Sequence, residues 1–330
     1  MSIALDAMGG DHAPREIVLG AIEAAPLIHH KIILVGDPAK IDEFLPKPVP
    51  SNILIHPASE VVEMHEKPLD AIRKKKDSSL VVAVDLVKQG QAGAFVSAGN
   101  TGACTAASLL AWRQIHGFHR PAIASPLPSF HGNFLLLDAG ASPDVDPEHL
   151  VEFALMGRSY ASKVMGRENP RVHLLNIGEE EGKGNAFAKQ AFSLLAKHEW
   201  FAGNIEGKDM FHEPCDVVVC DAFVGNIVLK TAEGVGELIM RIVRSGMPNN
   251  KIMQLPYAPM KPIFADIKRR MDYAEVGGSP LLGLNGLCII CHGRSNAKAI
   301  RNALLLAQKG IDNGVVEEMR ASIKLEEGIE

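Results

Sequence analysis

Short apolar runs alternate with helical patterns along the whole chain, and this alternation constrains the fold more than any other feature. The apolar runs lie at 2–6, 31–35, 52–56, 93–97, 134–138, 172–177, 216–221 and 287–291. Several are almost continuously apolar, which is typical of strands covered on both faces. The alternation therefore predicts an α/β fold, with a Rossmann-like, mostly parallel sheet and helices on both of its faces.

Helical segments are predicted between these runs, beginning just after Pro14. Apolar residues at Ile17, Val18, Ala21 and Ile22 fall on one helical face, and Pro14 suits a first turn. Further helical patterns lie at 67–90, 102–113, 147–165, 185–198, 225–244 and 295–310. Because no repeat, low-complexity tract or linker interrupts the pattern, we predict a single domain over residues 1–330.

Composition excludes several classes of protein. The net charge is −5 and no long basic tract is present, so nucleic acid is not an expected partner. The first residues lack the pattern of a signal peptide, and no apolar run reaches the roughly eighteen residues of a membrane span. The five cysteines have no framework spacing, which predicts a reducing, cytoplasmic environment. Cys288 and Cys291 form a CxxC in an apolar run, where we interpret them as core residues rather than as a redox or metal site.

Five of the predicted strands end in a small polar or acidic residue that is followed closely by glycine. In an open α/β sheet, ligands bind at the carboxyl ends of the strands. Glycine allows the backbone to approach a ligand, and helix N-termini present free N–H groups to an anion. The sequence therefore predicts an anion site at one edge of the sheet. The residues are Asp6, Gly9, Gly10, Asp11 and His12; Ser97, Gly99, Asn100, Thr101 and Gly102; Asp138 and Gly140; Asn176, Gly178 and Lys183; and Asp221, Gly225 and Asn226.

The stretch NIGEEEGKGN, residues 176–185, resembles a phosphate-binding P-loop but departs from it twice. Three residues separate Gly178 from Gly182 where the P-loop has four, and Gly184 stands where a Ser or Thr would bind magnesium. Lys183 opens the following helix, where the helix dipole disfavours a cation unless an anion is shared. Lys183 is thus either a solvated lysine or the charge that holds an anion smaller than a nucleotide.

Other catalytic motifs are missing. The chain has no GxSxG, no HExxH and no GxGxxG after its first apolar run, so a hydrolase elbow, a zinc protease and a standard dinucleotide site are not predicted. The stretch CHGRSNAKA, residues 291–299, places His292 and Ser295 at a strand-to-helix turn. Ser295 is the predicted N-cap of that helix.

Seven motifs occur in the order found in the bacterial phosphate acyltransferase family, PlsX: DAMGGDHAP, SAGNTGA, NIGEEEGKGN, GNIEGKD, DAFVGNIVLKTAEG, GGSPLLGLNG and HGRSNAKA. The resemblance covers nearly the whole chain, about residues 1–310. It implies a fold similar to those of the isocitrate/isopropylmalate dehydrogenases and the phosphotransacetylases. Ser142, Ala222 and Ser279 depart from the family pattern, and these small substitutions bear on loop geometry more than on the reaction.

The resemblance implies reversible transfer of a fatty acyl group from acyl-[acyl-carrier-protein] to inorganic phosphate. The acyl phosphate would serve phospholipid (phosphatidic acid) synthesis through the glycerol-3-phosphate acyltransferase PlsY. Thiolate is a good leaving group, so the enzyme needs positioning and positive charge rather than a covalent nucleophile. No cofactor and no metal are expected. We assign Lys183 and Asn226 to the reacting centre. The residues assigned to phosphate or substrate contact are Gly10, Asp11, His12, Ser97, Gly99, Asn100, Thr101, Gly102, Asp138, Gly178, Asp221, Gly225, Gly278, Ser279 and His292.

Residues 246–275 do not fit a sheet, and we predict an inserted amphipathic helical hairpin there. Four prolines divide the segment, and its stretch from Lys251 to Arg270 has a net charge of +4 in an acidic chain. The resemblance favours a hairpin that contacts both a partner subunit in a homodimer and the anionic inner face of the cell membrane. Alternatively, its basic residues would receive the acidic carrier protein. The residues predicted for this surface are Leu255, Tyr257, Met260, Lys261, Phe264, Lys268, Arg269 and Arg270.

Two functions from other classes remain open at this point. A decarboxylating dehydrogenase of the related fold would bind nicotinamide and carry a metal-binding aspartate cluster. A non-catalytic acyl-chain or carrier-protein module would bind its ligand without turnover. Nicotinamide fluorescence and product formation distinguish the two from an acyltransferase.

Overall fold

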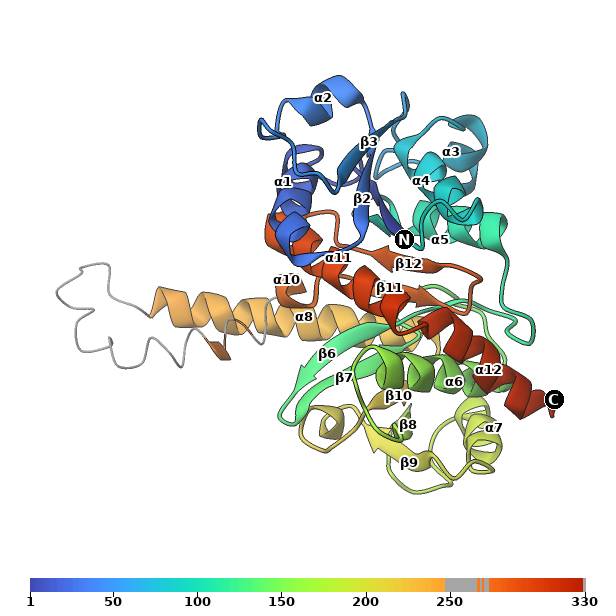
Figure 1. The fold of residues 1–330 in the computed structure, drawn as a ribbon. Coiled ribbons are helices and arrows are strands. Elements are labelled where there is room, and N and C mark those ends of the chain that lie inside the picture. Colours follow the sequence, from blue (N-terminus) through green and yellow to red (C-terminus); the bar gives the residue numbers. More distant parts are fainter. Residues whose placement is uncertain (247–265, 268, 270–272, 329–330) are drawn as a thin grey trace.

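The strands form two sheets, with helices packed around both (Figure 1). The computed structural model describes residues 1–246, 266–267, 269 and 273–328. The first sheet has the order β3-β2-β1-β4-β12-β11-β5, and the second has the order β6-β7-β10-β8-β9. The strands are β1 (Ser2–Asp6), β2 (Lys31–Gly36), β3 (Ile53–Pro57), β4 (Ala94–Ser97), β5 (Ala122–Ile123), β6 (Ser125–Ser129), β7 (Gly132–Leu137), β8 (Val172–Asn176), β9 (Phe201–Glu206), β10 (Val217–Val219), β11 (Ser279–Leu282) and β12 (Leu287–Ile290).

Most neighbouring strands are parallel, so the predicted α/β class is confirmed. Each of the eight apolar runs forms a strand. The exceptions to parallel pairing are β6 with β7, and β11 with both β12 and β5. Sequence reasoning missed β5, β6, β9 and β11. Prolines in β6 and β11 argue against strands, and β5 has only two residues.

The helices follow the predicted pattern, with additional short ones. They are α1 (Arg15–Ala24), α2 (Pro38–Asp42), α3 (Pro68–Lys74), α4 (Ser79–Lys88), α5 (Thr101–Trp112), α6 (Pro147–Lys163), α7 (Ala186–Leu195), α8 (Ala222–Ser245), α10 (Tyr273–Val276), α11 (Ala297–Asp312) and α12 (Val315–Glu327), with 3₁₀ turns η1 (Ala25–Leu27) and η2 (Asp209–Phe211). The single helix expected over 67–90 is wrong. Ser78 accepts a hydrogen bond from the Val81 N–H and so begins a second helix there.

Except at the edge strand β3, both faces of the first sheet are buried, which explains why its strands have few polar residues. Ile3 and Leu5 of β1 pack in one hydrophobic cluster with α1 and α11, and Ala4 packs in another with α4 and α5. Cys288 is buried on β12, and Cys291 follows that strand. Both are free thiols in the core, as predicted.

Helix α8 begins directly after the second sheet and extends outward from the body of the molecule (Figure 1). Its outer half carries exposed apolar side chains, namely Val235, Leu238, Ile239 and Ile242. Among the described residues, no helix is both long and apolar enough to cross a membrane.

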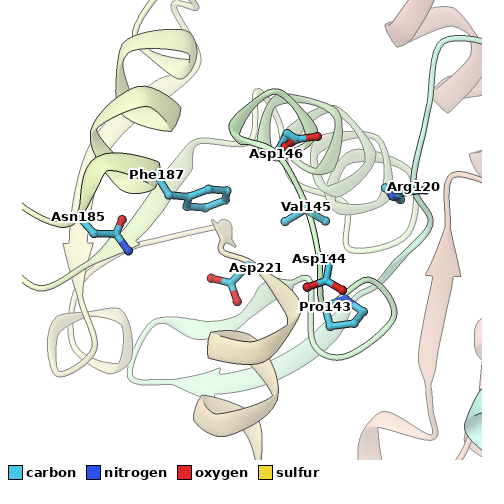
Figure 2. Close-up of a pocket in the computed structure, with 8 residues that line it drawn as sticks. All are labelled: Arg120, Pro143, Asp144, Val145, Asp146, Asn185, Phe187 and Asp221. Carbon is cyan, nitrogen blue, oxygen red and sulfur yellow. The ribbon is translucent and has the colours of Figure 1, made fainter.

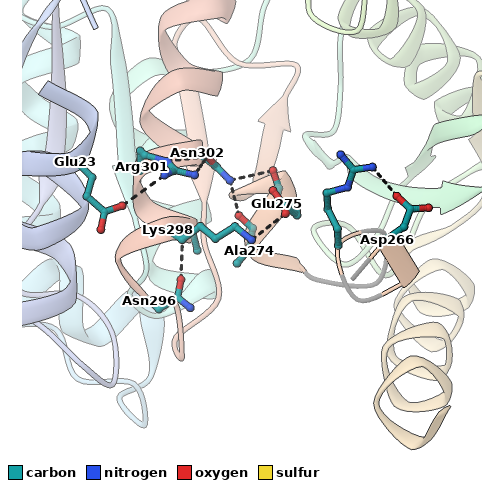
Figure 3. Close-up of polar contacts among 10 residues, drawn as sticks. Glu23, Asp266, Ala274, Glu275, Asn296, Lys298, Arg301 and Asn302 are labelled. Atoms are coloured by element: carbon teal, nitrogen blue, oxygen red, sulfur yellow. Dashed lines mark hydrogen bonds and ion pairs between the residues drawn. The ribbon is translucent and has the colours of Figure 1, made fainter. Parts of the chain in front are cut away.

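Most of the predicted hairpin, including Leu255, Tyr257, Met260, Lys261, Phe264, Lys268 and Arg270, lies outside the described residues. Arg269 is described and pairs with Asp266 at 2.5 Å. The next described helix is α10, which contacts α11. Asn302 donates to the carbonyls of Ala274 and Glu275 at 2.7 and 3.2 Å, and Lys298 pairs with Glu275 at 2.9 Å (Figure 3).

Candidate active site between the two sheets

The loops after β1 and β4 are joined through two buried polar side chains. Ser97 Oγ donates to Asp6 Oδ2 at 2.7 Å and accepts from the Gly99 N–H at 2.9 Å. Burial raises the pKa of Asp6, and its hydrogen bonds act in the opposite direction. A side chain at Gly9 would meet Asp6 Oδ2 at 2.4 Å and the Gly99 nitrogen at 2.9 Å, so only glycine fits. The pair therefore fixes the two glycine loops against each other.

The other residues of the loop after β4 either hold its backbone in place or are exposed. Asn100 is buried; its Oδ1 caps α5 at Ala103 N, and its Nδ2 donates to the Met64 carbonyl. Thr101 is exposed at the start of α5, and Gly102 packs against Pro68.

The first loop also reaches the loop that follows β12. The backbone N–H of Asp11 donates to the Gly293 carbonyl at 2.7 Å, and Gly10 has φ +112°, which favours glycine. The side chains of Asp11 and His12 are exposed. The predicted residues of this group are thus brought together at the carboxyl ends of β1, β4 and β12.

Asp138, which follows β7 of the second sheet, is fully buried. Its Oδ1 accepts the N–H groups of Ile123, Gly140 and Ala141, and its Oδ2 accepts that of Ser142, all within 3.0 Å. Burial raises the pKa of Asp138, and the four N–H donors act in the opposite direction. Its carboxylate thus organises the loop.

The start of α8 packs directly on that loop. Asp221 Oδ1 accepts the N–H groups of Phe223 and Val224 at 2.9 and 3.0 Å, so Asp221 holds the first turn of the helix. A side chain on Gly225 would lie 1.9 Å from the Asp138 carbonyl oxygen, which excludes any other residue. The exposed Asn226 lies beside Gly140, with its Oδ1 3.9 Å from the place of a Cβ there.

Lys183 lies in an exposed loop after β8. Its Nζ is 3.6 Å from Glu180 Oε2, and its aliphatic chain covers the buried Gly178. Asn176 Nδ2 donates to the Lys183 carbonyl at 3.2 Å and shapes the loop. The expectation that Lys183 opens a helix is wrong, because α7 begins at Ala186 with Asn185 as its N-cap. Because Lys183 lies outside α7, the dipole of that helix disfavours its positive charge less than expected.

Beside this loop, a cavity of about 470 Å³ opens between α6, α7 and α8. Figure 2 shows Asp221 between the α7 residues on one side and the loop before α6 on the other. The lining residues are Arg120, Pro143, Asp144, Val145, Asp146, Asn185, Phe187 and Asp221. Of these, sequence reasoning named only Asp221. Arg120 belongs to a loop without a glycine motif, whereas Asn185 ends the quoted glycine stretch and offered a signal.

A second, larger cavity of about 740 Å³ lies between β6, η2 and α8, and most of its lining is apolar. Leu127, Met210, Phe211, Ile227 and Val235 contribute to its walls. Three predicted site residues lie at its polar part, namely Gly278, Ser279 and His292. Ser279 Oγ is 3.1 Å from Ser125 Oγ, a contact that joins the first sheet to the second.

The predicted site residues form two groups, and the expectation of one sheet edge is wrong. β1 and β4 belong to the first sheet, whereas β7, β8 and β10 belong to the second. Helix α8 connects the groups, because Glu233 Oε1 lies 3.1 Å from His292 Nε2 and Glu237 pairs with Arg294 at 2.7 Å. Ser295 is buried but does not cap α11; Asn296 does, by accepting from the Ala299 N–H.

This arrangement of two sheets and glycine loops is the fold of the phosphotransacetylases. A phosphotransacetylase structure from Streptococcus pyogenes superposes with a TM-score of 0.63 over 94% of each chain, at 15% identity.

The sequence then defines the family. The profile of the fatty acid synthesis protein family matches residues 1–318. The phosphate acyltransferase of Desulfitobacterium hafniense (strain DSM 10664 / DCB-2) is 49% identical over 326 residues, which cover 98% of each chain. That of Heliobacterium modesticaldum is 51% identical over 327 residues, again 98% of each chain. The chain therefore belongs to this family of phosphate acyltransferases, PlsX, and the predicted resemblance is confirmed.

The Glu233–His292 contact gives a pH-dependent prediction. Burial acts to raise the pKa of Glu233, but hydrogen bonds from His292 and Lys230 outweigh burial and hold it at about 2. A lowered carboxyl pKa stabilises the fold above the unfolded value near 4.5, and this stabilisation is lost as pH falls through about 2. Glu233→Gln should lower the free energy of unfolding at pH 7 by about 1 kcal/mol.

Urea unfolding of the variant and the wild type between pH 7 and pH 3 measures this effect, and the difference should shrink below pH 4.5. Glu168→Gln, at an exposed bend between α6 and β8, is the control. A difference that stays constant across this range would show that the charge of Glu233 is not responsible.

Proposed function

We propose that this acyltransferase moves a fatty acyl group from acyl-[acyl-carrier-protein] to inorganic phosphate. A phosphate oxygen attacks the thioester carbonyl carbon, the carbon–sulfur bond breaks, and the carrier leaves as thiolate with acyl phosphate as the other product. The family supports acyl transfer in lipid synthesis. The observation that carries the proposal is the apolar cavity that reaches polar loop residues Ser279 and His292, since a fatty acyl thioester needs both environments.

The phosphate would bind where the glycine loops meet helix N-termini. The N-terminus of α5 and the loop 97–102 offer backbone N–H groups, and Thr101, Asn226 and Lys183 are exposed. The Lys183–Glu180 pair is exposed and 3.6 Å long, and such pairs contribute only about 0–1 kcal/mol. Little is therefore lost when Lys183 turns to a bound phosphate or to the oxyanion of the transition state.

The large cavity would hold the acyl chain. Each methylene that leaves water contributes about 0.8 kcal/mol, so an apolar wall of this extent favours long chains over short ones. The acyl phosphate would then pass to phosphatidic acid synthesis through the glycerol-3-phosphate acyltransferase PlsY.

Lys183→Ala should reduce kcat/KM for phosphate-dependent acyl transfer by about 100-fold, because it removes the charge that stabilises the oxyanion. The assay follows the free thiol of the carrier protein, starting from palmitoyl-acyl carrier protein with and without phosphate. Hydroxylamine traps the acyl phosphate as a hydroxamate. Lys189→Ala, an exposed lysine of α7, is the control.

The same assay separates the alternatives. Thiol release without phosphate would indicate a thioesterase, and no release would leave a binding module. A change in nicotinamide fluorescence on mixing would support a dehydrogenase. Near-normal turnover by Lys183→Ala would remove this residue from the reacting centre.

Ala232→Phe should reduce kcat/KM for palmitoyl-acyl carrier protein more than kcat/KM for hexanoyl-acyl carrier protein. Ala232 lines the large cavity from α8, so the added ring occupies volume that only a long chain would need. Ala321→Phe on the exposed side of α12 is a control with the same added volume. Equal loss with both substrates would mean that the acyl chain lies elsewhere.

The exposed apolar side chains on the outer half of α8 support a homodimer in which this face is covered. The segment that follows α8 in sequence is basic and apolar, and it would contact an anionic membrane or the carrier protein. Contact with the membrane would make the chain a peripheral protein of the inner membrane face.

Deletion of residues 255–264 should reduce co-sedimentation with anionic liposomes, while light scattering still gives the mass of a dimer. Liposomes of neutral lipid serve as the control. Unchanged co-sedimentation would overturn the membrane role, and a monomer mass for the wild type would overturn the dimer.

A further inference from the structure

His29 and His30, just before β2, lie beside Asp312, the last residue of α11, although they are far from it in sequence. His30 Nε2 lies 2.8 Å from Asp312 Oδ1, and His29 Nε2 lies 3.3 Å from the same oxygen. One potential ligand atom from each of the three residues falls within 4.8 Å of the others. The His30 side chain is only 9% exposed, whereas those of Asp312 and His29 are 36% and 65% exposed. None of the three takes part in the proposed acyl transfer.

The backbone on both sides of the cluster is fixed. The His29 N–H donates to Gln308 Oε1 at 2.9 Å, one turn before Asp312 on α11. Asn52 Nδ2 donates to the carbonyls of Ala25 and Ile28 at 2.9 and 3.1 Å, which holds the approach to the two histidines. The imidazole rings lie with their centroids 4.3 Å apart. Ligands held in this way lose little conformational entropy when an ion binds.

The donor set matches a first-row transition-metal dication. Two imidazole nitrogens and one carboxylate oxygen are common zinc ligands, with water in the fourth position. Metal–ligand bonds of about 2.0–2.1 Å in a tetrahedron place ligand atoms roughly 3.3 Å apart, near the separations seen here. Asp312 is also the last residue of α11, and the partial negative charge of a helix C-terminus favours a cation.

A second cluster of similar composition, formed by His119, His149 and Glu152, lacks this capacity. His149 Nδ1 accepts the Asp146 N–H at 2.8 Å, so a neutral ring must keep its proton on Nε2 and has no lone pair for a metal. Both Glu152 oxygens already bind His119, one through the ring and one through the backbone N–H, each at 2.7 Å. In the part of the chain that the structure describes, no backbone donor occupies Nε2 of His29 or His30.

The geometry points to a metal site at His29, His30 and Asp312 that binds one Zn²⁺ or a similar dication. It lies at the amino end of β2, whereas the glycine loops lie at carboxyl strand ends, so the site is separate from the proposed acyl-transfer site. A bound ion joins residues 282 positions apart in sequence and stabilises the folded chain by mass action.

Zinc titration of the full-length chain, freed of any histidine tag and of chelator, tests the site. Isothermal calorimetry should give one ion per chain, and zinc in excess should raise Tm by a few degrees. His29→Gln and Asp312→Asn should each weaken zinc binding by roughly tenfold or more while leaving acyl transfer unchanged. Asp312→Asn keeps an oxygen that can accept from His30, so this variant is expected to fold. His149→Gln, from the second cluster, and His131→Gln, at an exposed turn, are controls that should bind zinc like the wild type.

Two outcomes would overturn the site. The first is no heat of binding and no change in Tm with the wild type. The second is equal zinc affinity in the wild type, His29→Gln and Asp312→Asn, which would place the ion elsewhere on the chain.

Discussion

The buried carboxylate of Asp138 is the interaction on which the arrangement of the two sheets depends. Asp138 follows β7 of the second sheet, yet one of its four N–H donors is Ile123 of β5 in the first. Ser142 Oγ reinforces the junction by donating to the Pro121 carbonyl at 2.9 Å. Burying a carboxylate without hydrogen bonds would destabilise the fold by several kcal/mol, and the four N–H donors to Asp138 offset this destabilisation. Their geometry in turn fixes where the loop and the start of α8 lie.

Two kinds of surface that the proposed acyl transfer would require lie on either side of this junction. Glycine loops and helix N-termini lie at the carboxyl ends of the strands, where a small anion can be bound by backbone groups. The apolar cavity lies against α8 and β6, and it reaches the loop residues at Ser279 and His292. Buried carboxylates organise the loops, whereas Lys183 and Asn226 are exposed.

The sequence was sufficient for the class of the fold and for most of its strands, because continuous apolar runs between helical patterns are compatible with few architectures besides a covered parallel sheet. It was insufficient where tertiary contacts decide. Ser295 and Asn296 are both good N-cap residues, and only the packing of α11 makes Asn296 the cap. The change of sheet between β5 and β6 occurs within three residues and leaves no mark on periodicity, so the loops were placed on one edge. Arg120 was missed because a single arginine in a loop carries no signal before the cavity around it is known.

Helix α8 is a continuous rod of 24 residues, which corresponds to about 36 Å at 1.5 Å per residue. Its inner end is seated on the Asp138 peptide at Gly225, its middle is tied to the first sheet by Glu233 and Glu237, and its outer end stands clear of the body (Figure 1). Ile227, Ala232 and Val235 of this rod line the apolar cavity, so the position of the rod sets the width of that cavity.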